Sequence, residues 1–151
     1  MTKTSDKNIA TVLHLSTLTQ YLIPFGNYIF PIVIWSSKKD ESEFVNENGK
    51  KVMNFQLSMF LYSIVLCLIA IPIMLYTFFH NIPFEAIING DDFIIRNFHF
   101  GEINGIAVLG ITAGFLFGVL KVAEFILTIL AAVKASNGEA YKYPLSIPFF
   151  K

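Results

Sequence analysis

A run without a single charged residue at positions 55–79 (FQLSMFLYSIVLCLIAIPIMLYTFF) constrains this chain more than any other feature. Crossing the hydrocarbon core of a bilayer takes about 20 apolar residues in a helix. Two further runs reach that length, at about 12–35 and 106–133. A helix satisfies its backbone hydrogen bonds along its own length, as lipid requires. We therefore predict an all-α integral membrane protein with three transmembrane helices in one polytopic domain, residues 1–151.

Composition agrees with a membrane protein and excludes several function classes. The chain is 54% hydrophobic and 15% aromatic, with a mean hydropathy of +0.59, whereas a soluble domain needs a more polar surface. Its net charge is zero and it has no basic stripe, so no nucleic-acid partner is expected. The single cysteine, Cys67, permits neither an intrachain disulfide nor a CxxC metal site.

The distribution of Lys and Arg predicts the orientation. With three crossings, the first loop and the C-terminus share a side, and that side carries more basic residues than the other. The seven on that side are Lys38, Lys39, Lys50, Lys51, Lys134, Lys142 and Lys151, against Lys3, Lys7 and Arg96. Because basic residues are retained on the cytoplasmic side, the first loop and the C-terminus are predicted to be cytoplasmic.

The third predicted helix carries small residues and an ion pair. Gly110, Gly114 and Gly118 are four apart, a spacing that lets helices approach closely in lipid. Lys121 and Glu124 are three apart on the same side of the helix, so they can pair with each other. The pair is either an internal salt bridge that fixes helix packing or part of an ion or proton pathway.

The first predicted helix has a polar and proline-containing stripe, which we expect to face the interior of the bundle. Its members are Thr17, Gln20, Pro24, Asn27 and Pro31. Positions 24–27 are either a kink in a structural helix or a hinge or re-entrant break that lines a cavity. His14 is interpreted as an interfacial or hydrogen-bonded histidine rather than a metal ligand.

The second loop and the tail are less regular. Residues 80–102 are either a hairpin turning at Asn89-Gly90 or an interfacial amphipathic segment. Their acidic and histidine residues match no metal motif. Asn137-Gly138 predicts the end of the third helix, and Pro144 prevents its continuation. The rest of the tail is predicted to be a short extended segment at the membrane interface.

No nucleophile elbow, Gly-rich phosphate loop or metal motif is present, so the sequence predicts no enzyme, no cofactor and no metal. Three stretches instead resemble a bacterial membrane family, domain of unknown function 4870. They are HLSTLTQYLIPFGNYIFPIVIW (14–35), KKDESEFVNENGKKVMNFQ (38–56) and AAVKASNGEAYKYPLSIPFFK (131–151). That family is grouped with the magnetosome membrane protein MamF and, distantly, with the twenty-kilodalton import subunit of the chloroplast inner envelope.

The resemblance implies an oligomeric protein of the bacterial inner membrane. It singles out the motif positions Gly49, Asn54, Phe55, Gln56, Gly138, Glu139, Tyr143 and Pro144. We expect the tail to pack against the first loop, with Glu139 near Lys50 or Lys51 and with Asn54 or Gln56 bonded to the tail backbone. The predicted function is a non-enzymatic scaffold in the lipid bilayer that associates with itself or with a membrane-protein partner. The alternative is a small transporter, channel or translocation component.

Overall fold

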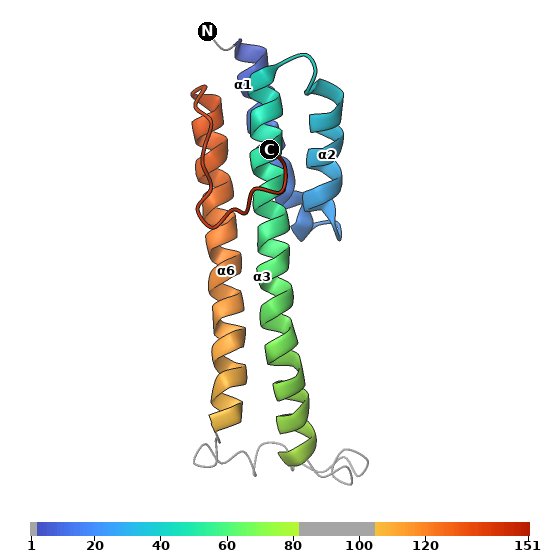
Figure 1. The fold of residues 1–151 in the computed structure, drawn as a ribbon, viewed down its shortest axis with the longest axis vertical. Coiled ribbons are helices and arrows are strands. Elements are labelled where there is room, and N and C mark those ends of the chain that lie inside the picture. The colour runs from blue at the N-terminus through green and yellow to red at the C-terminus, as the bar shows by residue number, and fades with distance from the viewer. Residues whose placement is uncertain (1–2, 82–104) are drawn as a thin grey trace. The chain divides into compact units, whose positions relative to one another are not determined.

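The computed structural model describes residues 3–81 and 105–151, and their regular secondary structure is entirely helical (Figure 1). The elements are α1 (Thr4–Leu15), the 3-10 helix η1 (Ser16–Tyr21), α2 (Gly26–Lys38), α3 (Glu43–Asn81) and α6 (Gly105–Ser136). The chain divides into two compact units. The first comprises residues 1–62 and 120–151, and the second comprises residues 63–119. The prediction of an all-α protein is confirmed for the described residues.

Two helices, α3 and α6, are long and apolar enough to cross a membrane. The candidate spans are Glu43–Tyr76 and Val108–Ser136. Only 17% and 22% of their most apolar windows are buried within the chain, so most of these side chains face outward. That exposure is typical of helices in lipid, because the core helix of a soluble protein is mostly covered. The predicted spans at 55–79 and 106–133 correspond to these two helices.

The remaining predicted span, the first one at 12–35, is not one helix, so the count of three spans is not confirmed. Phe25 has a φ of 61°, which ends the helical path, and the preceding Pro24 has no backbone N–H. The chain then turns back, and α2 packs closely against η1 because Gly26 has no side chain. A Cβ atom on Gly26 would lie 2.6 Å from Thr19 Oγ1. Helices α1 and α2 have 12 and 13 residues. They therefore rise only about 18–20 Å, less than the hydrocarbon core.

Within the first unit, the other segments pack around the N-terminal half of α3. One core cluster contains Phe55, Met59, Ala131 and Tyr143, and another contains Leu13, Val45 and Val52. The tail, residues 137–151, is not helical and crosses α3 in red in Figure 1. Its position at a membrane interface stays a prediction.

Helix α6 ends as the sequence predicts. Gly138 has a φ of 85°, a left-handed conformation that glycine adopts without strain. The N–H of Glu139 donates to Lys134 O at 3.0 Å, and the N–H of Gly138 donates to Ala135 O at 2.9 Å. This pair of bonds is the Schellman motif, and it redirects the chain into the tail.

The second unit contains the remaining halves of α3 and α6. A Cβ atom on Gly110 would lie 2.7 Å from Ile73 Cγ2, so these two helices approach closely at that position. Both interpretations of the second loop concern residues 80–102. Residues 80 and 81 belong to α3, and the rest of that loop, with the turn at Asn89-Gly90, lies outside the described residues.

Candidate functional site

The most connected polar cluster in the first unit centres on His14, which is fully buried. Its Nδ1 lies 2.8 Å from the Tyr143 hydroxyl, and its Nε2 lies 2.9 Å from Asn48 Oδ1. Asn48 Nδ2 donates to Phe44 O at 2.8 Å, which identifies Oδ1 as the acceptor on the other side of the amide. His14 Nε2 therefore carries the proton, and Nδ1 accepts a hydrogen bond from Tyr143. One imidazole thus joins α1, α3 and the tail.

The electrostatics of this cluster favour neutral groups. The pKa of His14 is lowered from 6.5 to about 4, chiefly by burial; the bond to Asn48 raises it and the positive charge of Lys51 lowers it. Burial also raises the pKa of the Tyr143 phenol far above its ordinary range. At neutral pH the imidazole and the phenol are both uncharged, so the bond between them is an ordinary neutral hydrogen bond.

The tail is held on α3 by three polar side chains spaced four residues apart. Asn54 binds the backbone of Phe150 twice, accepting its N–H at 2.7 Å and donating to its O at 2.9 Å. Ser58 Oγ accepts the N–H of Ile147 at 2.8 Å. Tyr62 donates to Leu145 O at 2.9 Å. Residues four apart lie on one face of a helix, so this face of α3 forms the docking site for the tail.

The structure confirms that Asn54, one of the two amides expected to do so, binds the tail backbone, but the expected pairing of Glu139 is wrong. Glu139 pairs with Lys134, five residues earlier, rather than with Lys50 or Lys51. Gln56 accepts a hydrogen bond from Asn27 at 2.8 Å instead of binding the tail. The difference at Glu139 follows from the sharp turn at the end of α6, which brings Glu139 back beside its own helix.

A second polar cluster surrounds Glu124, whose side chain is 1% exposed. One carboxylate oxygen accepts from Lys121 at 2.8 Å, and the other accepts from Gln20 at 3.2 Å. The expected pair on α6 is therefore present, and the first-helix stripe supplies its additional donor. Of that stripe, Thr17, Asn27 and Pro31 are also buried, whereas Pro24 is exposed at the turn.

The three glycines of α6 do not form one packing face within the chain. Gly110 packs against Ile73, but Gly114 and Gly118 are exposed, and a Cβ atom added to either would meet nothing within 4 Å. Successive positions four apart advance by about 40° around a helix, so the stripe turns away from the buried face.

Of the remaining motif positions, three have a role in packing or in a turn, and one is exposed. A Cβ atom on Gly49 would lie 2.3 Å from Trp35 Cδ1, so only glycine leaves room for the indole there. Phe55 stacks on Tyr143 with ring centroids 4.0 Å apart and an angle of 12°. Gly138 makes the turn into the tail, and Pro144 is exposed.

The polar groups of these clusters hydrogen-bond to one another and so hold different segments of the chain together. Among the described residues no group of three His, Cys, Asp or Glu side chains could hold a metal ion. Among the side chains described, those of residues 3–76 and 108–151, Ser63 Oγ alone is a buried polar atom without a partner. Sequence reasoning missed the bond between His14 and Tyr143, because nothing in their local patterns links positions 129 residues apart.

Comparison with known proteins supports a single assignment. No curated protein and no solved structure matches the chain. The family model that matches is described as the magnetosome magnetite crystal formation protein family, MamF and MmsF, and it covers residues 5–150. The predicted resemblance to MamF is thereby confirmed, while the assignment to domain of unknown function 4870 and the chloroplast relationship stay predictions. Because the match includes α1, α2, both candidate spans and the tail, the chain belongs to the magnetosome magnetite crystal formation protein family.

Proposed function

We propose that this membrane protein is a non-enzymatic scaffold that self-associates or holds a membrane-protein partner within a complex. The observation that carries the proposal is the use of the buried polar groups. His14, Tyr143 and Asn48 bind one another, and Glu124 is bound by Lys121 and Gln20. Groups engaged in this way fix the positions of segments, and they are not poised to attack or protonate a substrate.

An exposed surface on α6 supports association with another helix. Gly114 and Gly118 leave open space beside the backbone, and both are exposed in the isolated chain. Small residues on an outward face let a second helix approach closely in lipid. The expected partner is therefore a transmembrane helix, either from a second copy of this chain or from another membrane protein.

The proposed location is the bacterial inner membrane, crossed by α3 and α6. Because α2 is too short to cross and the chain reverses at the turn before it, the N-terminus joins the first turn and the C-terminus on one side. Nine basic residues then lie on that side, against Arg96 alone between the two spans. The nine are Lys3, Lys7, Lys38, Lys39, Lys50, Lys51, Lys134, Lys142 and Lys151. This asymmetry supports a cytoplasmic location for both termini.

Crosslinking in native membranes tests the scaffold and separates it from a transport pathway. The wild type is compared with two double variants, Gly114→Leu/Gly118→Leu and Lys121→Leu/Glu124→Met. We expect a multimer or a defined partner with the wild type, its loss when leucines fill the glycine positions, and its retention when the ion pair is replaced. A wild type that crosslinks to nothing would refute the scaffold. Ion flux into proteoliposomes that requires Lys121 and Glu124 would favour the transporter.

A further inference from the structure

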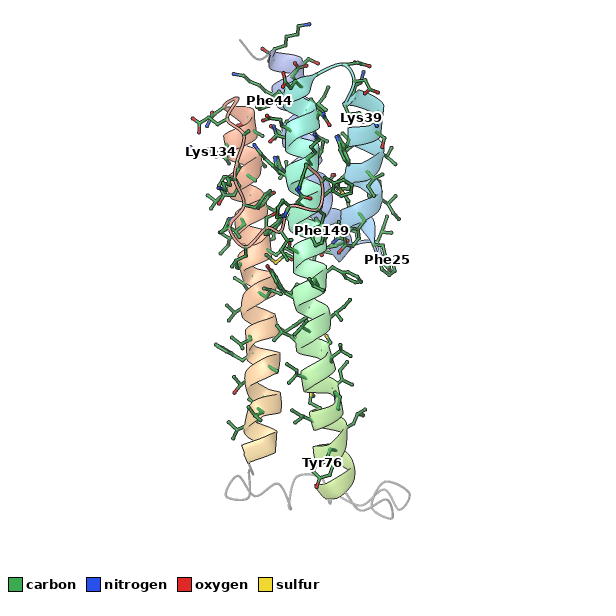
Figure 2. All side chains as sticks on the ribbon, viewed as in Figure 1. Phe25, Lys39, Phe44, Tyr76, Lys134 and Phe149 are labelled. Atoms are coloured by element: carbon green, nitrogen blue, oxygen red, sulfur yellow. The ribbon has the colours of Figure 1, made fainter. Side chains whose placement is uncertain are left out.

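The turn between η1 and α2 carries a group of large apolar side chains that stay largely exposed in the described part of the chain. Leu22 is 84% exposed and Phe25 is 67% exposed, and Tyr21 and Ile23 beside them are also exposed. Figure 2 shows Phe25 pointing outward at one end of α2, with Lys39 at the other end. We refer to residues 21–25 as the hairpin tip. In water such a tip would be unfavourable, since its apolar area would remain hydrated.

The backbone of the hairpin tip is largely provided with hydrogen bonds from inside the hairpin. The N–H groups of Leu22 and Ile23 donate to Thr19 O at 3.0 and 2.8 Å, and the N–H of Gly26 donates to Ile23 O at 3.0 Å. Pro24 has no N–H to satisfy. An aqueous turn can leave these groups to water, whereas a turn in hydrocarbon needs partners within the protein.

The side-chain hydroxyl groups of η1 likewise have their hydrogen-bond partners within the protein. The hydroxyl groups of Ser16, Thr17 and Thr19 each donate to the backbone O three residues earlier, at 2.6–2.9 Å. Such bonds hide a hydroxyl against its own helix. Gln20 and Asn27 point inward, where they bind Glu124 and Gln56.

The partners of the hairpin place it beside the apolar part of the spans. Gln56 and Glu124 belong to the candidate spans Glu43–Tyr76 and Val108–Ser136. The ring of Tyr28 packs edge-on against Phe60 with centroids 6.1 Å apart, and Tyr21 packs in the same way against Phe125 at 6.3 Å. Both Phe60 and Phe125 are exposed. The hairpin therefore lies beside outward-facing apolar side chains of both spans, and Tyr21 of its tip lies beside Phe125.

Charge distribution gives the hairpin a polar base and an apolar tip. Between Lys7 and Lys38 the sequence contains no Asp, Glu, Lys or Arg. Both flanks are charged, at Lys3, Asp6 and Lys7 before the hairpin and at Lys38, Lys39, Asp40 and Glu41 after it. The 13 residues of α2 rise about 20 Å, more than half but less than all of a hydrocarbon core of about 30 Å.

We propose that the hairpin formed by α1, η1 and α2 enters the membrane from one face, places residues 21–25 among the acyl chains near the middle of the hydrocarbon core and returns without crossing. The occupant of the exposed tip is lipid. Lysines at the base lie at the level of the headgroups, and Trp35, near the end of α2, lies at the interface. This inference does not depend on self-association or on a partner.

The test measures depth and sidedness of the full-length protein with single cysteines. In a Cys67→Ser background, the variants Asn8→Cys, Leu22→Cys and Lys39→Cys place one thiol before, at and after the tip. All three native side chains are exposed, so a label should not disturb packing. Fluorescence of Trp35, the only tryptophan, verifies the fold of each variant.

After spin labelling in phosphatidylcholine/phosphatidylglycerol vesicles, collisions with oxygen report acyl chains and collisions with a water-soluble nickel chelate report water. We expect the oxygen-to-nickel ratio to be severalfold higher at position 22 than at 8 and 39. In whole cells carrying the variants, thiols 8 and 39 should both be protected from an impermeant maleimide, and both should react after the cells are opened. Reaction from opposite sides would overturn the hairpin. Frequent collisions of the label at position 22 with nickel would show that water surrounds the tip. A crosslink between two copies at position 22, with few collisions with either reagent, would show that a second copy covers it. Either result would overturn the proposal that lipid does.

Discussion

Acidification should destabilise this protein through His14. The imidazole is fully buried and neutral, with both nitrogens in hydrogen bonds. Protonation would place a proton on Nδ1, which now accepts from Tyr143, so the tail contact must rearrange. Burial holds the pKa of His14 at about 4 in the folded state, against 6.5 for an ordinary histidine.

The sign and size of the effect follow from these two values. Between pH 6.5 and pH 4 the unfolded chain binds a proton that the folded chain excludes, so stability falls as the pH falls through this window. From pH 7 to pH 5, this difference in proton binding lowers the free energy of unfolding by about 2 kcal/mol. The full separation of the two pKa values corresponds to about 3 kcal/mol, which is reached below pH 4.

The assay is thermal unfolding in a neutral detergent at pH 7, 6 and 5, followed by the fluorescence of Trp35. This reporter is suitable because its ring packs against Phe150 of the tail, with centroids 5.5 Å apart. His14→Gln is the matched control, since its amide can donate to Asn48 and accept from Tyr143 but does not titrate. Carboxylates titrate in both proteins, so the difference between their slopes isolates His14. Parallel loss of stability in the two proteins would refute the assignment of a buried neutral imidazole.

Two other contacts give sharp predictions in the same assay. Gly49→Ala should lower the free energy of unfolding by about 1–3 kcal/mol, because its Cβ would overlap Trp35. Gly114→Ala, the matched control, should leave it unchanged or raise it by up to about 1 kcal/mol, because its Cβ would meet nothing. Equal effects of the two substitutions would show that Trp35 does not occupy the space beside Gly49. Asn54→Ala should cost about 1–3 kcal/mol by leaving the N–H and O of Phe150 unpaired, and it should expose Trp35 to a water-soluble quencher. A quenching profile identical to that of the wild type would mean that the tail does not depend on Asn54.

The features that the sequence predicts correctly depend on local patterns. The candidate spans follow from long runs without charge, the end of α6 follows from Gly138, and the pair on α6 follows from the spacing of Lys121 and Glu124. Each of these is determined by residues within a few turns of one another. The interactions that create these features therefore join residues that are close together in the sequence.

The sequence left a break at positions 24–27 as one of two alternatives, because the turn has the composition of a membrane helix. Turns in water are recognised by polar residues and glycine. Here the reversal uses Leu22-Ile23-Pro24-Phe25, whose apolar side chains continue the hydrophobic run without interruption. Pro24 and Gly26 permitted both a kink and a break. The choice is made by tertiary contacts, such as the close packing of Gly26 against Thr19, which no spacing rule encodes.

The motif Asn54-Phe55-Gln56 shows what the tail and the hairpin do for α3. Successive residues of a helix point about 100° apart, so three in a row cannot face one partner. Asn54 binds the backbone of the tail, Phe55 stacks on a tail tyrosine, and Gln56 binds Asn27 of the hairpin. In lipid the two amides would each be costly without those bonds. Helix α3 therefore needs both segments around this turn, and the motif is the junction that holds them to it.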